Sequence, residues 1–312
     1  MKNDKVHRQR KKGAKSGKID AKSGLLYGLV LLCFLAAGSL GVVAVMNYLK
    51  VQKTPKEIPI FSEDDKNRMV EEQTDYERNY YEIIPEDMEL FRQYVELNDE
   101  VVGIITIRDS ILRHPLMQSP TRGECFYLSH DLNRNHNFHG VPFLTLNSDL
   151  SREEGNNIIY GHNIIHTEPK DVFCDLVNYE DIGYYKSHPI VELITRQGTA
   201  KYIIFSYAIM DTSDSDAFVY WEDVCWEDDK AFNDYMSQME ARNWLDTEVP
   251  YSRYDAFITI STCSLELAHS GTNRMVLMAR RLEVGENYEN YIDNAKMRET
   301  PLLPQKLREE EK

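Results

Sequence analysis

Three residues of the types used in acyl transfer stand at the edges of apolar, β-rich runs. His162 follows the run NNIIYG, Cys263 ends the run FITISTC, and Arg274 precedes the run MVLMARRL. A thiol attacks a carbonyl carbon efficiently when a nearby histidine carries the proton. An arginine fork stabilises the oxyanion that forms. Together the three residues predict a cysteine nucleophile, a histidine acid–base group and an arginine partner.

Each of these residues also has a purely structural interpretation. A free cysteine is often a small buried hydrophobic residue, a loop histidine is often simply hydrogen-bonded, and an arginine at a strand start is often a surface charge. The prediction therefore depends on the three strand edges lying together. If the runs around Cys263 and Arg274 form a hairpin, their ends are neighbours on either side of the loop at 264–273.

A second polar cluster lies in the segment HDLNRNHNFH. It contains His130, His136 and His139. This spacing is not one of the familiar zinc patterns, and no cysteine pair accompanies it. We therefore expect no metal and no other cofactor.

The elements that must position these residues are short and mostly β. From residue 101 onward, runs rich in Ile, Val, Phe, Tyr and Thr alternate with turn residues, which is typical of a barrel or sandwich. Two helices are expected within this part, over 168–179 and over 226–245, the second directly before the cysteine run. Two more are expected ahead of it, over 64–81 and over 86–97 after Pro85. The expected strands are VVGIITI, HPLMQS, CFYLSHD, GVPFLTLN, NNIIYGHNI, PIVELITR, KYIIFSYAIM, FITISTC and MVLMARRL.

Charge is distributed unevenly along the 312 residues. Residues 1–23 carry nine basic and two acidic residues, although the whole chain has a net charge of −15. Between the basic and the acidic parts, Leu25 to Leu49 contains no charged residue, and about 20 apolar residues span a bilayer as a helix. The basic flank predicts a cytoplasmic N-terminus and an exported remainder. The acidic exported part disfavours nucleic-acid binding.

A cleaved signal peptide is the alternative interpretation of this span. Its apolar region is usually only about 7–15 residues long and ends in small residues, whereas this run is longer and ends in MNYLK. We therefore expect an uncleaved anchor. Of the five cysteines, Cys33 lies in the span, and the others show no close pairing; a Cys125–Cys174 or a Cys174–Cys225 bridge stays open.

At this point the motifs resemble the sortases, membrane-anchored cysteine transpeptidases of Gram-positive bacteria. TISTC (259–263) is similar to the family's TLSTC box, with Ile260 in place of leucine. IIYGHN (158–163) is similar to the segment with the catalytic histidine, and NRMVLMARRL (273–282) to the arginine strand. The resemblance covers about residues 86–283. Its class B character rests on DEVVGIITIRDSILRHPLMQS (99–119), CFYLSHD (125–131), HGVPFLTLN (139–147) and the long helix before the cysteine strand.

The resemblance implies a mostly β fold, an eight-stranded sortase barrel with N-terminal helices. It implies that Cys263 forms a thioacyl enzyme with the threonine of a C-terminal sorting motif, that His162 transfers protons, and that Arg274 holds the peptide or the oxyanion. Ser261 and Thr262 are expected to support the site through hydrogen bonds. The implied partners are secreted proteins with a sorting signal and an amine of a lipid-linked peptidoglycan precursor or of a pilin. The loop at 264–273 is expected to influence what the enzyme accepts.

The expected organisation has five parts. They are a basic cytoplasmic tail (1–23), a single transmembrane anchor (24–49), a linker and stalk helix (50–85), an extracellular catalytic barrel (86–283) and a charged, irregular C-terminal tail (284–312). Surface-protein anchoring is the favoured function. The alternatives are a pilin-polymerising enzyme, an exported cysteine peptidase or amidase that uses water, and a tethered binding module with an inert Cys263.

Overall fold

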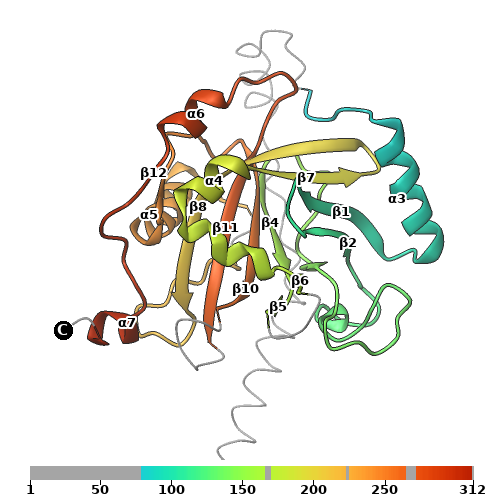
Figure 1. The fold of residues 1–312 in the computed structure, drawn as a ribbon, viewed down its shortest axis with the longest axis horizontal. Coiled ribbons are helices and arrows are strands. Elements are labelled where there is room, and N and C mark those ends of the chain that lie inside the picture. Colours follow the sequence, from blue (N-terminus) through green and yellow to red (C-terminus); the bar gives the residue numbers. More distant parts are fainter. Residues whose placement is uncertain (1–78, 166–169, 223–224, 265–271, 311–312) are drawn as a thin grey trace, which may run out of the picture. The chain divides into compact units, whose positions relative to one another are not determined.

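Eight strands form a closed barrel in the C-terminal part of the chain. The computed structural model describes residues 79–165, 170–222, 225–264 and 272–310, which belong to one compact unit, Glu77–Lys312. Around the barrel the strand order is β1-β2-β3-β4-β10-β11-β8-β7 (Figure 1). The prediction of a mostly β, eight-stranded barrel is confirmed.

The barrel strands follow the runs expected from the sequence. Neighbouring strands are antiparallel except for β4 with β10 and β2 with β3, which are parallel. Their bounds are β1 (Val101–Ile107), β2 (Arg113–Met117), β3 (Phe143–Leu144), β4 (Gly155–Tyr160), β7 (Ile190–Thr195), β8 (Gly198–Asp211), β10 (Ala256–Cys263) and β11 (Asn273–Arg281).

Alternate residues of the strands pack on opposite sides of the barrel wall. The largest core cluster takes residues from all eight barrel strands, among them Ile258 and Ile260 of β10. Phe257 belongs instead to a second cluster outside the wall, with the buried face of α5 (Asp229–Arg242). Because both sides of the wall are covered, every residue of β10 before Cys263 is buried, including the polar Thr259 and Ser261.

Two of the predicted helices, the one over 86–97 and the one over 226–245, are present. α3 (Pro85–Leu97) begins with a proline in its first turn, where the missing N–H costs no helical hydrogen bond. α5 begins after Asp228, whose side chain accepts a hydrogen bond from Ala231 N at 2.7 Å. α5 covers part of β8, and α3 covers β1 and β7.

Two local predictions were wrong. CFYLSHD was expected to be a strand, but Phe126–Leu128 form a short 3₁₀ helix, η1, because the buried Tyr127 turns inward to donate to Glu100. The helix expected over 168–179 is instead β6 (Asp171–Val172), which pairs with β5 (Asn163–Ile164), followed by the 3₁₀ helix η2 (Cys174–Glu180). Val172 has φ of 56°, a value that an α-helix does not accommodate.

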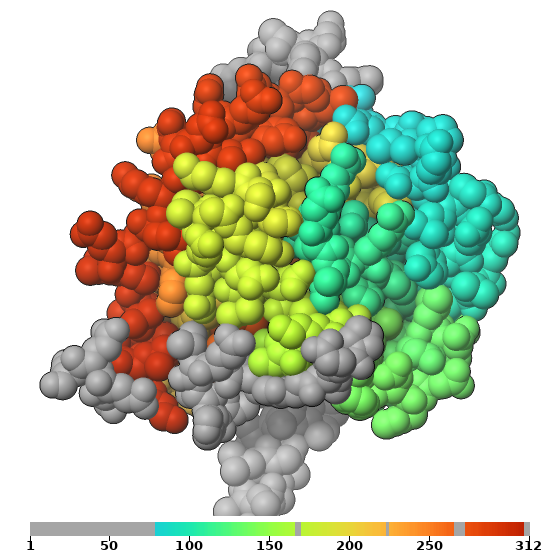
Figure 2. Space-filling view, viewed as in Figure 1, coloured from blue at the N-terminus to red at the C-terminus, as the bar shows by residue number. Residues whose placement is uncertain are grey.

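The structured residues after β11 differ from the irregular tail expected there. They form α6 (Glu289–Asn294), β12 (Lys296–Met297) and α7 (Gln305–Glu310), and β12 pairs with β9 (Leu245–Asp246). In Figure 2 these red residues form a band along one side, while η2 and α4 (Ile182–Ser187) cover the middle of the visible face. The charged composition gave no sign of the contacts that order this segment.

The basic tail, the membrane anchor and the stalk helix over 64–81 fall almost entirely in residues 1–78, outside the described residues. Within the described part of the chain, no helix has the length and apolar character needed to cross a bilayer. The four cysteines of that part, Cys125, Cys174, Cys225 and Cys263, are all free thiols.

Candidate active site

The register of three neighbouring strands, β4, β10 and β11, brings the three predicted residues to one end of the barrel. Ser261 of β10 lies opposite Tyr160 of the parallel strand β4, and both His162 and Cys263 follow two residues later. On the other side of β10, Cys263 lies directly opposite Arg274 in the antiparallel pairing with β11. Parallel pairing of β4 and β10 is decisive here, because it places the C-terminal ends of both strands at the same edge.

Cys263 is partly exposed, and the backbone around it is tied to the segment that carries His162. Asn163 Nδ2 donates to the carbonyl oxygen of Cys263 at 3.1 Å. Thr262 Oγ1 donates to the carbonyl oxygen of Gly161 at 2.8 Å. The two bonds cross between β10 and the β4–β5 connection in opposite directions. They hold the cysteine and histidine segments in a set relation without occupying the thiol or the imidazole.

The His162 ring is held by a backbone carbonyl. Its Nε2 lies 2.9 Å from the carbonyl oxygen of Leu128 in η1. Since a carbonyl oxygen only accepts, Nε2 carries a hydrogen, and the neutral ring then has Nδ1 as its proton acceptor. The Leu128 carbonyl therefore selects both the orientation and the tautomer of the ring.

A buried network fixes η1 behind His162. Tyr127 donates to Glu100 Oε2 at 2.6 Å, and Asn98 Nδ2 donates to the Tyr127 hydroxyl at 2.8 Å. Burial and the Glu100 contact raise the pKa of Tyr127 to about 12. Although burial opposes it, hydrogen bonds from Ser119, Tyr127 and Arg134 hold the pKa of Glu100 below its usual value. The carboxylate thus stays charged and anchors the turn.

Two tyrosines that the sequence did not single out line the same end of the barrel. The Tyr220 hydroxyl lies 2.7 Å from Ser261 Oγ in a buried contact. Burial raises the pKa of Tyr220 to about 12, and the Ser261 hydrogen bond and the Arg274 charge act in the opposite direction. Burial also raises the pKa of Tyr160. Both phenols are therefore neutral near pH 7 and supply ring surface and hydroxyls rather than charge.

The Arg274 guanidinium lies at the start of β11, half-buried. Its Nη1 donates to the carbonyl oxygen of Asn273 at 2.9 Å. The charge is close enough to the phenols of Tyr160 and Tyr220 to oppose the rise of their pKa values. Arg280 and Arg281, further along β11, are committed elsewhere: Arg280 pairs with Glu286, and the Arg281 guanidinium lies 4.0 Å from the centroid of the Tyr80 ring.

The histidine-rich segment does not assemble into a metal centre. The rings of His130 and His136 lie 5.9 Å apart, while His139 Nδ1 contacts Asp171 Oδ2 at 3.0 Å. His114 Nε2 contacts the other Asp171 oxygen at 3.1 Å. Among residues 79–310, less the masked gaps, no group of three or more His, Cys, Asp or Glu side chains is arranged to hold a metal ion.

The sequence predicted His162, Cys263 and Arg274 as site residues and Ser261 and Thr262 as their supports, but it did not single out Asn163, Leu128 or Tyr220. Asn163 could have been proposed because it directly follows His162 in the sequence. Leu128 and Tyr220 could not, because they lie far from their partners His162 and Ser261 in the sequence. The loop at 264–273 was expected to influence what the enzyme accepts, and most of it, residues 265–271, lies outside the described residues.

The known proteins that this chain resembles in sequence and in fold are sortases of the B type. The chain is 26% identical to sortase B of Staphylococcus aureus (strain NCTC 8325 / PS 47) over 195 residues, which are 62% of this chain and 75% of that protein. It is 26% identical to sortase B of Listeria monocytogenes serovar 1/2a (strain ATCC BAA-679 / EGD-e) over 189 residues, covering 61% and 72%. No family model matches the chain.

Solved structures give the same result for the fold. The crystal structure of Staphylococcus aureus sortase B matches with a TM-score of 0.53 at 25% identity, covering 62% of this chain and 87% of that one. A Staphylococcus aureus sortase B–substrate complex matches with a TM-score of 0.55 at 22% identity, covering 72% and 100%.

Proposed function

Because this chain is a cysteine transpeptidase of the sortase family, similar to class B, we propose that it anchors secreted proteins to the cell wall through Cys263, His162 and Arg274. The observation that carries the proposal is the register of β4, β10 and β11. It places a histidine, a thiol and an arginine at one barrel end, as acyl transfer requires.

In the first half-reaction the Cys263 thiolate attacks the carbonyl carbon of the threonine in the sorting motif. The peptide C–N bond then breaks, the protonated His162 ring gives its proton to the leaving amine, and a thioester remains. In the second half-reaction an incoming amine gives a proton to His162 and attacks the thioester carbon. The new amide bond forms as the C–S bond breaks and the thiolate is regenerated.

Arg274 is the oxyanion partner in this scheme. It lies directly across the β10–β11 pair from Cys263, so its fork is positioned to face a carbonyl oxygen bound at the thiol. A charged donor gains strength where water is excluded, and the half-buried Tyr160 and the buried Tyr220 lie close enough to feel its charge. Ser261 and Thr262 act as supports through their bonds to Tyr220 and to the Gly161 carbonyl.

The substrate is proposed from the relatives. A related sortase B has been solved as a substrate complex, and by analogy the donor here is a secreted protein with a C-terminal sorting signal. The acceptor is an amine of a lipid-linked peptidoglycan precursor. A pilin lysine is the second candidate acceptor, and water is the third.

The proposed location is the outer face of the cell membrane. The support is the sequence of residues 1–49, a basic segment followed by an uncharged apolar run. A single-pass anchor with a cytoplasmic N-terminus holds enzyme, sorting substrate and lipid-linked acceptor on one surface. Tethering there raises their effective concentrations without any new contact.

The test is a peptide assay with the full-length chain in detergent. A library of sorting peptides is incubated with and without hydroxylamine as the amine, and products are identified by mass. We expect cleavage after threonine, a predominance of the hydroxamate when the amine is present, and complete loss of turnover in Cys263→Ala with an unchanged circular dichroism spectrum. Dominant hydrolysis despite saturating amine indicates the peptidase alternative. Turnover by Cys263→Ala rules out the mechanism.

A further inference from the structure

The residues that follow β11 are bound to the body of the barrel domain at several successive points. Arg298 N donates to the carbonyl oxygen of Trp244 at 2.8 Å, and Leu302 N donates to that of Ala241 at 2.8 Å. α7 then reaches the loop that joins β8 to α5. We call residues 298–310 the C-terminal clamp and residues 212–222 the β8–α5 loop.

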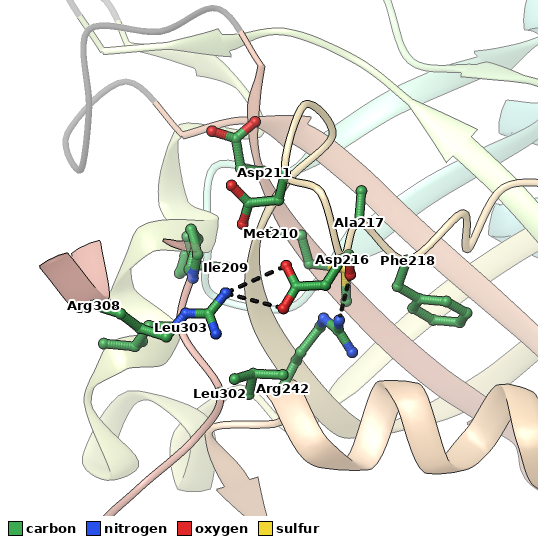
Figure 3. A pocket seen from close by; sticks show the side chains of 12 residues that line it. Ile209, Met210, Asp211, Asp216, Ala217, Phe218, Arg242, Leu302, Leu303 and Arg308 are labelled. Carbon is green, nitrogen blue, oxygen red and sulfur yellow. Dashed lines mark hydrogen bonds and ion pairs between the residues drawn. The ribbon is translucent and has the colours of Figure 1, made fainter. Parts of the chain in front are cut away.

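Three residues of this loop, Asp214, Ser215 and Asp216, contact the clamp, and Figure 3 shows the contact between Asp216 and Arg308. Arg308 Nη2 lies 3.0 Å and 3.3 Å from the two carboxylate oxygens of Asp216. Gln305 N, at the start of α7, donates to Asp214 Oδ2 at 2.8 Å. The clamp and the loop also line one small pocket together, with Leu302, Leu303 and Arg308 from the clamp and Asp216, Ala217 and Phe218 from the loop (Figure 3).

The inner side of the loop is held by α5. Arg242 is buried, and its Nη2 donates to the carbonyl oxygen of Asp216 at 2.9 Å. Its guanidinium also lies 5.8 Å from the centroid of the Phe218 ring. Asp216 therefore contacts two arginines. Arg308 binds its carboxylate and Arg242 binds its backbone carbonyl, as Figure 3 shows.

Both ends of the same loop contact the candidate active site. At its start, Thr212 N donates to the carbonyl oxygen of Thr272 at 3.1 Å, two residues before Arg274. Near its end, the Tyr220 hydroxyl meets Ser261 Oγ, two residues before Cys263. The loop that holds Asp216 therefore contacts the surroundings of both Arg274 and Cys263.

We propose that the C-terminal clamp positions the β8–α5 loop for peptide binding, and that Arg308 and Asp216 are positioning residues for the sorting substrate. This inference rests on the proposed function. A loop that is already ordered loses less conformational entropy when a peptide binds against it, so the clamp improves binding without touching the reacting atoms. Loss of the clamp should therefore raise KM more than it lowers kcat.

The experiment compares matched variants of the full-length chain in detergent. Arg308→Glu turns the attraction to Asp216 into a repulsion, and Arg308→Lys keeps the charge. Arg92→Glu makes the same charge change at an exposed ion pair of α3. A deletion of residues 304–312 removes the whole contact. Each protein is measured for KM and kcat with the cleaved peptide, and for hydrogen–deuterium exchange of residues 212–222.

We expect Arg308→Glu to raise KM by roughly 2- to 10-fold, as follows from an exposed ion pair replaced by repulsion, with kcat little changed and faster exchange at 212–222. The deletion should exceed this effect, Arg308→Lys should restore most of it, and Arg92→Glu should match the wild type. The deletion counts only if exchange in β10 and β11 is unaltered.

Unchanged exchange and KM in both Arg308→Glu and the deletion overturn the clamp. Faster exchange with unchanged KM also overturns it, because the loop is then irrelevant to binding. If the wild-type chain cleaves no peptide, the proposed function has failed instead. In that case the exchange data still decide whether the clamp orders the loop.

Discussion

Replacing Gly140 by alanine tests whether the Leu128 carbonyl controls His162, the proposed acid–base residue. Gly140 has φ of +59°, and an added Cβ would lie 2.5 Å from the Tyr127 carbonyl oxygen and 2.7 Å from the Leu128 carbonyl oxygen. Real Cβ contacts are essentially never this short, so the backbone of η1 must shift. The Leu128 oxygen that moves is the partner of His162 Nε2.

The magnitude follows from two separate costs. Alanine in the left-handed region costs about 1–2 kcal/mol of folding stability, which lowers the melting temperature by roughly 2–8 °C for a domain of this size. A shift of about 0.5 Å takes a 2.9 Å hydrogen bond beyond its usual range. Loss of such a bond is worth about 0.5–1.5 kcal/mol, so kcat/KM should fall by roughly 2- to 13-fold.

Gly285→Ala is the matched control. Gly285 also has a left-handed φ, +85°, but no atom lies within 4 Å of its added Cβ. Both variants should lose stability, yet only Gly140→Ala should lose kcat/KM, measured at a temperature where both are fully folded. Wild-type kcat/KM in both variants would refute the role of the Leu128 carbonyl. An equal loss of kcat/KM in both variants would also refute it, because backbone strain alone would then explain the loss.

Three further predictions concern other contacts. Arg274→Lys should stay folded but lose roughly 10- to 1,000-fold in kcat/KM, because lysine lacks the planar fork; a loss below threefold contradicts the oxyanion role. Tyr220→Phe should lose about 1–3 kcal/mol of stability by leaving Ser261 Oγ without its buried partner, and a double-mutant cycle with Ser261→Ala that shows no coupling argues against the bond. Burial lowers the pKa of His114, so the folded chain binds fewer protons than the unfolded one and stability falls as pH drops below about 6.5. Thermal unfolding between pH 7.5 and 5 should show this fall, and His114→Gln should reduce it.

The residues of the candidate site were readable from the sequence for a local reason. His162, Cys263 and Arg274 each stand where an apolar run ends or begins, and burial of a barrel strand leaves such a run in the chain. The same logic located α3 and α5, since a helix records its buried face and its cap in consecutive residues. Membrane anchoring also rests on local composition and stays a prediction, because residues 1–78 lie outside the described part.

The supports of the site depended on tertiary structure. Leu128 reaches His162, and Tyr220 reaches Ser261, across 34 and 41 residues of sequence, and no period or cap marks such a contact. The segment CFYLSHD is apolar enough for a strand, but the buried bond from Tyr127 to Glu100 turns it into η1. Long-range bonds override local propensity whenever a buried polar group needs a partner.

The C-terminal segment shows most clearly the difference between what local sequence indicates and what tertiary contacts decide. Its many charges are typical of a solvated tail, but Arg308 meets Asp216 because α7 lies against the loop between β8 and α5. By itself the sequence determined the candidate chemical groups and most of the strands that carry them, because those are encoded by neighbouring residues. Only the tertiary structure decided which neutral groups and distant loops hold that chemistry in place, because strand register and loop packing join residues far apart in the chain.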